Sequence, residues 1–165
     1  MLAALVRLMQ RGVDFQADIV GEGELFSALR FSIEDLGLRD RVRLSGALSS
    51  AEVLSRLQAT DIFVLSSVEE GISNAVLEAM ATGVPIVTTT AGGMVEAVTD
   101  GVEGFVVPVR NAAALADRIE RLATDPAARV AMGAAARRRA EQDFSIQRQA
   151  TEFESIYRSV VGASS

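Results

Sequence analysis

Cysteine, histidine and lysine are all absent from this chain of 165 residues. Without cysteine there is no disulfide and no thiolate metal site. Without histidine, Ser-His-Asp hydrolysis, histidine-ligated metals and proton transfer through imidazole are excluded. Because all 16 basic residues are arginine, Schiff-base lysines and the phosphate-binding lysine of a P-loop are excluded too. Carboxylates, hydroxyls, arginines, Tyr157 and backbone amides remain for chemistry.

Long apolar runs and an excess of positive charge are lacking as well. No stretch approaches the length of a membrane span, and the start MLAALVRLMQRG has no secretory n-region or cleavage site. These features predict a cytoplasmic protein. The net charge of −6 argues against a general nucleic-acid binder, which would carry a basic face.

The length and the hydrophobic content of 49% indicate one globular domain over residues 1–161 and a disordered tail over 162–165. Patterning predicts five strands, at Phe15–Val20, Val42–Leu44, Ile62–Ser66, Pro85–Thr89 and Gly104–Val107. It predicts seven helices, at Leu2–Gln10, Glu24–Leu36, Ala51–Gln58, Asn74–Ala81, Ala112–Thr124, Ala127–Asp143 and Ile146–Val160. Such alternation predicts an α/β fold with a doubly wound, mostly parallel sheet. The run IFVLSS is continuously apolar before it turns hydroxylic, which is typical of an interior parallel strand.

Glu78 is the only charge between Gly71 and Val95. The apolar, small and hydroxylic residues around it predict a helix and a strand that are buried on most sides. An ionised carboxylate in such a place is costly to desolvate unless it is paired or hydrogen-bonded. Glu78 is therefore a candidate for binding a polar ligand, with a wet position at the rim of a core helix as the alternative.

The loop Glu70-Gly71-Ile72-Ser73-Asn74 connects the third predicted strand to the helix that carries Glu78. Gly71 permits a sharp turn, and Ser73 or Asn74 can cap the helix. Free amides at the start of that helix attract an anion such as a diphosphate. Glu70 and Glu78 would flank this anion and suit hydroxyl groups on either side. The alternative is an ordinary capped helix with solvated acids.

Two further glycine turns follow predicted strands. Gly92 and Gly93 allow close approach of the backbone to a ligand, although a simple turn explains them equally well. Gly21 and Gly23 precede Phe26, which occupies the third glycine position of a dinucleotide-binding motif, so that motif is not present. A tight turn beside a nucleotide base remains open.

Two helical patterns near the end of the chain have structural explanations. The run Arg137–Arg139 is typical of a solvated helix face, with contact to an anionic membrane surface as the lesser alternative. The stripe Ile146, Ala150, Phe153, Tyr157 and Val160 has helical spacing and is expected to pack on a core or on a domain partner.

Together these residues resemble the donor-binding, C-terminal half of group 1 retaining glycosyltransferases (family 4), which have the GT-B fold. The most specific part is Glu70, seven intervening residues and Glu78, in the context EEGISNAVLEAMATGVPIV. The later segment AGGMVEAVTDGVEGFVVP resembles the Gly-Gly/Glu segment and closing strand of the family. Gly21 and Gly23 resemble its glycine turn near the nucleotide.

The resemblance implies a role for each matching residue. Glu78 would bind the ribose, and Glu70 would contact the donor sugar near the reacting end as the catalytic residue. Amides of Gly71, Ile72, Ser73 and Asn74 would hold sugar hydroxyls and phosphate oxygens. Gly21 and Gly23 would lie near the nucleoside, and Gly92 and Gly93 near the interdomain cleft. The substrate would be a UDP or GDP sugar, with no cofactor and no metal.

The resemblance also implies missing parts. The family has an opening strand with Arg and Lys residues aimed at the diphosphate, in the middle of a sheet ordered 3-2-1-4-5-6, and an N-terminal acceptor domain. We expect this chain to lack both, to leave two strands without their common neighbour, to be inactive alone and to form homodimers through the incomplete sheet. In the full-length enzyme, peripheral contact with the inner face of the membrane is expected.

Two other functions fit parts of the sequence. The chain could be a non-catalytic module that binds nucleotide sugars and complements a separate partner chain. A phospho-acceptor signalling domain would explain acids at strand ends, but such domains need a lysine that is absent here.

Overall fold

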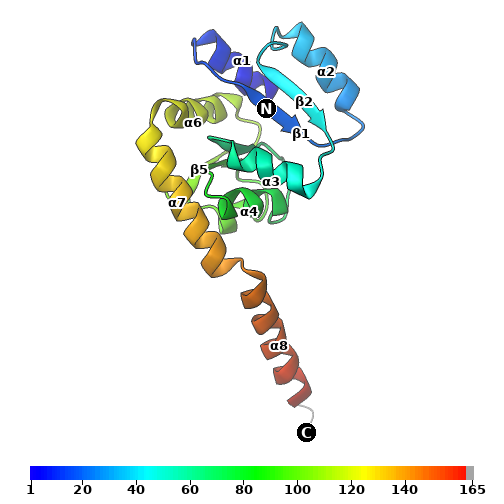
Figure 1. Cartoon of the computed structure of the whole chain (residues 1–165), viewed down its shortest axis with the longest axis vertical. Coiled ribbons are helices and arrows are strands. Elements are labelled where there is room, and N and C mark those ends of the chain that lie inside the picture. Colours follow the sequence, from blue (N-terminus) through cyan, green and yellow to red (C-terminus); the bar gives the residue numbers. More distant parts are fainter. Residues whose placement is uncertain (163–165) are drawn as a thin grey trace.

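The computed structural model describes residues 1–162 as an α/β body from which one long helix projects (Figure 1). Its strands are β1 (Ala17–Val20), β2 (Val42–Gly46), β3 (Phe63–Leu65), β4 (Ile86–Thr89) and β5 (Gly104–Val107). Its helices are α1 (Leu2–Gln10), α2 (Phe26–Asp35), α3 (Ser50–Gln58), α4 (Asn74–Ala81), α5 (Met94–Ala97), α6 (Ala112–Thr124), α7 (Pro126–Asp143) and α8 (Ile146–Gly162). All predicted elements are present, and only the four-residue α5 was not predicted.

The sheet is divided into two parallel parts. β1 pairs with β2, and β4 pairs with both β3 and β5. The order β2-β1 and β3-β4-β5 matches the predicted doubly wound order with its middle strand left out. The prediction that β3 is an interior strand is therefore wrong for the described residues, because β3 lies at an edge and its residues are only partly buried.

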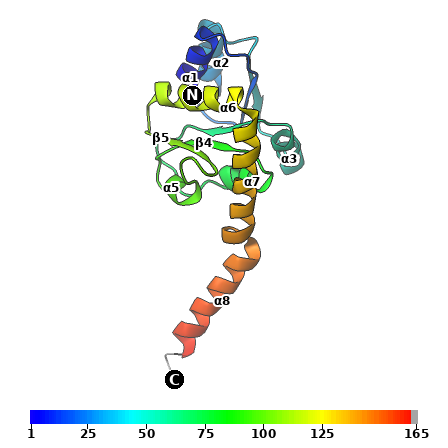
Figure 2. The same ribbon diagram turned by 90° about the vertical axis from the view of Figure 1, so that its left-hand side faces the viewer.

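Two apolar clusters cover the faces of the sheet. One joins α1 and α6 to the strands through residues such as Leu8, Phe105 and Leu122. The other joins α4 and α7 to the opposite face through Met80, Ile86 and Ala136. Helices therefore lie on both faces, as a doubly wound fold requires (Figure 2).

Side-chain caps fix the starts of α3 and α7, each one residue before its predicted start. Ser49 caps α3, and its hydroxyl and amide both donate to Glu52 in a capping box. These hydrogen bonds, first that of the hydroxyl and then that of the amide, hold the pKa of Glu52 below its ordinary value. Asp125 accepts a hydrogen bond from the amide of Ala128, and Pro126 begins α7.

Arg139 corrects the prediction of a fully solvated basic face on α7. Its guanidinium donates to the carbonyl of Glu96 at 3.0 Å and lies 3.8 Å from the carboxylate of Glu103. Glu103 is 4% exposed, and it accepts a hydrogen bond from the amide of Thr99 at 2.7 Å. Arg139 therefore fastens α7 to the turn between α5 and β5. Arg137 instead pairs with Glu141 on the exposed side of α7.

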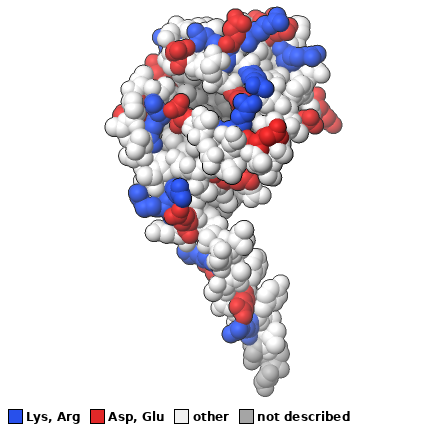
Figure 3. Space-filling view, viewed as in Figure 1, with Lys and Arg blue, Asp and Glu red and all other residues white. Residues whose placement is uncertain are grey.

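The stripe on α8 does not pack on a core, contrary to the first expectation. α8 leaves the body in both ribbon views (Figures 1 and 2), and Ile146, Phe153 and Tyr157 are exposed. Charges of both signs follow one another along this helix (Figure 3). Gly162, which was assigned to the tail, is the last residue of α8, and residues 163–165 lie outside the described part. Over residues 1–162 no helix combines the length and the apolarity needed to cross a membrane.

Candidate nucleotide-sugar site

α4 begins without a side-chain cap. Its N-cap residue is Ser73, as predicted, but the Ser73 side chain makes no capping hydrogen bond, whereas α3, α6 and α7 all have side-chain caps. The amides of Asn74 and Ala75 consequently have no acceptor among residues 1–162. These two donors and the helix dipole favour an anion at this end of α4, by roughly 0.3–1 kcal/mol at an exposed position.

Glu70 lies in the loop between β3 and α4, and its side chain is exposed. It accepts a hydrogen bond from the hydroxyl of Ser67 at 3.1 Å. The hydroxyl of Thr89 donates to the carbonyl of Ser67 at 2.6 Å, which ties this loop to the end of β4. The Glu70 carboxylate is thus held at the carboxyl ends of two neighbouring strands, where ligands bind in open α/β sheets.

Gly92 and Gly93 pack against the loop that contains Glu70. A Cβ atom on Gly92 would lie 1.7 Å from the carbonyl oxygen of Glu70, and the φ of Gly92 is +49°. A Cβ atom on Gly93 would lie 2.9 Å from the side chain of Ile72. The two glycines were expected to let the backbone approach a ligand closely. In the structure they instead let it approach residues 70–72 of the same chain. Gly71 itself has open space around it and no positive φ, so its conformation does not require glycine.

Glu78 is exposed, which corrects the expectation that its surroundings bury it. α4 buries one face, formed by Val76, Ala79 and Met80, and Glu78 lies on another side of the helix. The argument from desolvation cost therefore does not apply to Glu78. The structure instead places Glu78 at the solvated rim of a core helix, which was the alternative prediction.

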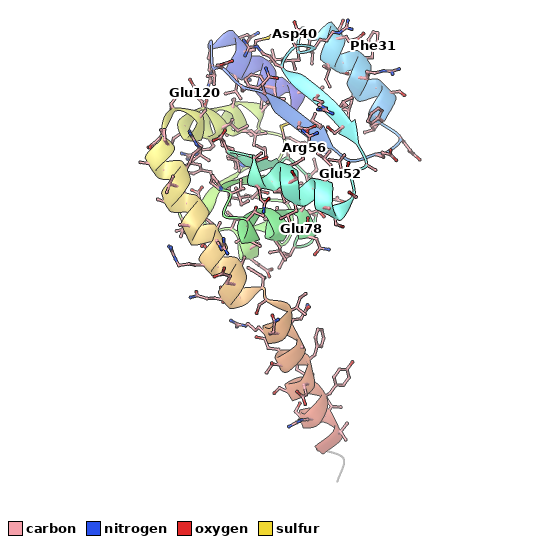
Figure 4. The ribbon with its side chains drawn as sticks, in the orientation of Figure 1. Phe31, Asp40, Glu52, Arg56, Glu78 and Glu120 are labelled. Atoms are coloured by element: carbon pink, nitrogen blue, oxygen red, sulfur yellow. The ribbon has the colours of Figure 1, made fainter. Side chains whose placement is uncertain are left out.

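A hollow of about 360 Å³ lies beside Glu78, between α3 and α4. Figure 4 shows Glu78 on α4, below the helix α3 that carries Glu52 and Arg56. The residues that line the hollow are mostly apolar, with a few polar groups: Leu48, Ser50, Val53, Leu54, Leu57, Glu78, Ala81 and Thr82. Glu70 is not among them. The volume and the mixed lining are of the kind that holds part of a small ligand.

Sequence reasoning missed the α3 side of this hollow. Val53 and Leu57 are four residues apart on α3 and predict one apolar face, but nothing in that spacing says that the face lies opposite Glu78. Leu48 comes from the turn after β2, and Ser50 is the first residue of α3.

Gly21 and Gly23 lie in an exposed turn after β1. The amide of Gly21 donates to the carbonyl of Gly46 at 2.8 Å, which joins this turn to the end of β2. Gly21 has a φ of +130°, a conformation that glycine adopts easily, and neither glycine has a close neighbour at its Cβ position. The turn therefore lies at the same strand ends as the hollow, because β2 leads directly to Leu48.

The assembled site offers two carboxylates, two free amides and an apolar hollow. Carboxylates accept hydrogen bonds from hydroxyl groups, and free amides at a helix start donate to anionic oxygens. Among residues 1–162 no three acidic side chains converge as a metal site would require. The arrangement suits a ligand that carries both hydroxyl groups and a negative charge.

Comparison with known proteins identifies a family. The sequence profile of the family "Glycosyl transferases group 1" matches residues 1–139. The amylovoran biosynthesis glycosyltransferase AmsK of Erwinia amylovora is 36% identical over 144 residues, which is 84% of this chain and 35% of AmsK. The D-inositol 3-phosphate glycosyltransferase of Pseudarthrobacter chlorophenolicus is 34% identical over 160 residues, 96% of this chain and 38% of that protein. The chain thus spans well under half of the length of these relatives.

Solved structures of other proteins have the same fold as this chain. HepE of Anabaena in complex with UDP is 28% identical with a TM-score of 0.80, and the match covers 92% of this chain and 43% of HepE. A sucrose-phosphate synthase of Thermosynechococcus elongatus is 26% identical with a TM-score of 0.88 over 98% of this chain and 42% of that protein. Structure and sequence therefore agree that the chain has the GT-B type of α/β fold and belongs to the group 1 glycosyl transferases.

Proposed function

We propose that this chain is the donor-binding half of a retaining glycosyltransferase, which moves a sugar from a nucleotide-diphosphate sugar to an acceptor hydroxyl. The observation that carries the proposal is the start of α4, where two amides lack an acceptor within residues 1–162. Glu70 precedes these amides in the sequence, and Glu78 follows them. The complexes of HepE with UDP and with UDP-glucose support a donor of this class.

In this proposal each predicted residue has one task. Glu78 accepts hydrogen bonds from the ribose hydroxyls, and the neighbouring hollow takes the nucleoside. The amides of Gly71–Asn74 bind phosphate oxygens and sugar hydroxyls, while Glu70 holds the sugar near its reacting carbon. Gly21 and Gly23 lie on the nucleoside side, and Gly92 and Gly93 keep the Glu70 loop in place.

The chemistry of a retaining transfer fits a site without histidine. The acceptor oxygen attacks the anomeric carbon on the face that the diphosphate leaves, so one carbon–oxygen bond forms as the other breaks. The departing diphosphate takes the proton of the acceptor hydroxyl. Donors fixed at the helix start stabilise the charge that develops on the diphosphate, which is the main catalytic contribution. The acceptor must be bound by another domain, so the chain alone is expected to be inactive.

Calorimetric titration with UDP, GDP and ADP tests the role of Glu78. We expect one diphosphate to bind and Glu78→Ala to weaken it about tenfold, or about 1.4 kcal/mol. Because the Glu78 side chain is exposed, the variant should keep its fold, which circular dichroism checks. Glu141→Ala is the matched control, since it removes one exposed carboxylate from α7. Equal affinity of the wild type and Glu78→Ala would remove Glu78 from the site.

A further inference from the structure

Two arginines of α6 stack on one aromatic ring of β5. The guanidinium carbons of Arg118 and Arg121 lie 4.8 Å and 5.1 Å from the centroid of the Phe105 ring. Phe105 is only 3% exposed, and it belongs to the apolar cluster that joins α1 and α6 to the strands. α6 lies over β4 and β5 on the side that also carries α1 (Figure 2). One buried ring therefore holds two positive charges close together.

Neither guanidinium has a partner of opposite charge. In the described part of the chain, the side chains of Arg118 and Arg121 form no hydrogen bond and no ion pair. Asp117 precedes Arg121 by four residues, a spacing that favours an ion pair on a helix. Arg11 of α1 instead donates to the carboxylate of Asp117 at 2.7 Å and to that of Glu120 at 2.6 Å. Both acids of α6 are thus used by α1, which leaves the two stacked arginines without a neutralising charge.

The acids beside β5 do not supply this charge either. Asp100 lies at the outer edge of β5, where its carboxylate accepts a hydrogen bond from the amide of Val106 at 3.0 Å. Glu103 is buried, and its carboxylate lies 3.8 Å from the guanidinium of Arg139 on α7. Neither acid forms an ion pair with the stacked arginines. An anion from outside the chain is therefore the partner that the two guanidiniums lack.

Stacking leaves the hydrogen-bond donors of both guanidiniums available. A guanidinium that lies on a ring uses the face of its plane, whereas its N–H groups point outward within that plane. These groups match the oxygens of phosphate in a bidentate arrangement. Because the Phe105 ring already restrains both side chains, less conformational entropy is lost when an anion binds. The pair is a preorganised set of donors for an oxyanion.

We propose that Arg118 and Arg121 form a second anion site, which binds a phosphate monoester. Such a group carries between one and two negative charges at neutral pH, so a single ligand compensates both guanidiniums. Arg118 is partly buried and Arg121 is exposed, which leaves the site open to a soluble phosphate or to the head group of a lipid. Both arginines lie well inside α6, away from the turn after the carboxyl end of β5. The site is therefore separate from the candidate nucleotide-sugar site, and the inference does not depend on the proposed function.

Titration of the full chain with inorganic phosphate at constant ionic strength tests the site. Two-dimensional NMR follows the Nε–Hε signals of the arginines, and those of Arg118 and Arg121 should shift with one common dissociation constant. The signal of Arg138 should stay in place. Arg138 is an exposed arginine of α7 that also has no partner among the described residues, so it reports general attraction of the ion to positive charge. Because α4 contains no arginine, phosphate bound at its start is not mistaken for this site.

Lysine variants separate the shape of the site from its charge. The double variant Arg118→Lys, Arg121→Lys keeps both positive charges but loses the two planar sets of donors. Its affinity for phosphate should fall about tenfold, since a hydrogen bond to a charged group is lost. Arg138→Lys is the matched control and should bind as the wild type does. Circular dichroism verifies the fold of both variants, and the signal shifts in the wild type remain decisive if the double variant does not fold.

Vesicles identify the source of the phosphate. Phosphatidylcholine vesicles that contain phosphatidic acid present a phosphate monoester, whereas those that contain phosphatidylglycerol present only a diester. Sedimentation of the chain with the first kind, and its loss in the double lysine variant, would identify a lipid head group. Shifts with inorganic phosphate but no sedimentation would identify a soluble ligand.

Three outcomes would overturn the proposal. The first is the absence of binding both to inorganic phosphate and to the vesicles. The second is a shift of the Arg138 signal as large as those of Arg118 and Arg121. The third is unchanged affinity of a folded double lysine variant, because charge alone would then explain the binding.

Discussion

Gly92 supports the site through its backbone. The carbonyl oxygen of Glu70 leaves no room for a Cβ atom on Gly92, and the φ of Gly92, +49°, is a left-handed conformation. We therefore expect Gly92→Ala to lower the free energy of unfolding by about 2–5 kcal/mol, which combines about 1–2 kcal/mol for left-handed alanine with about 1–3 kcal/mol for overpacking. The Glu70 loop should move with it, so affinity for the diphosphate should also fall. Urea denaturation and calorimetry measure the two effects.

Gly71→Ala is the matched control for this substitution. Gly71 is one residue from Glu70, but a Cβ atom there would meet nothing within 4 Å and no positive φ opposes it. Its free energy of unfolding should change by less than about 0.5 kcal/mol. Equal stability of Gly92→Ala and Gly71→Ala would contradict the close packing of the Gly92 turn on the Glu70 loop.

Glu78 shows where reasoning from composition fails. The window around it is rich in alanine, and alanine is compatible with both sides of a helix, so the window looks apolar throughout. The buried residues of α4 are Val76, Ala79 and Met80, which share one face. Glu78 follows Val76 by two residues, roughly 200° around the helix, and so lies on the other side. The exposure of Glu78 could be known only from the orientation of the helix.

The attachment of α7 to the body depends on Arg139. Removing its side chain would leave the carboxylate of Glu103 buried without its cationic partner and free the carbonyl of Glu96. We expect Arg139→Ala to lower the free energy of unfolding by about 1–3 kcal/mol, since Arg139 is itself partly exposed. Arg137→Ala should cost less than about 0.5 kcal/mol, because its pair with Glu141 is exposed. Urea denaturation compares the two variants. Equal losses of unfolding free energy in Arg139→Ala and Arg137→Ala would contradict the anchoring role of Arg139.

Helices and strands with clear terminal signals could be predicted from the sequence. α1, α4 and α6 have the predicted bounds, and α3 and α7 begin one residue before their predicted starts. α5 could not be predicted, because four residues are too few to show a helical period. The apolar run of β3 correctly indicated a strand, but sequence alone does not say whether a neighbour is present on each side.

Long-range arrangement was predicted less completely than local structure. The resemblance implied the strand order and a missing middle strand, and the divided sheet agrees with both. The hollow between α3 and α4 was not foreseen, since it depends on how two helices far apart in sequence pack together. On α8 the helical period identified the apolar side, but a period contains no information about what covers that side.

α8 gives a prediction about the whole molecule. None of its residues between 146 and 161 is buried, and both ribbon views show it directed away from the body (Figures 1 and 2). Removing residues 146–165 should therefore change the free energy of unfolding by less than about 0.5 kcal/mol. Far-UV circular dichroism in urea measures this. Intrinsic fluorescence cannot be used, because the chain has no tryptophan and its single tyrosine, Tyr157, is lost with the helix. Leu8→Ala, at a fully buried position, should lose about 2–5 kcal/mol in the same assay. A clear loss of stability on truncation would mean that α8 packs on the body, contrary to the structure.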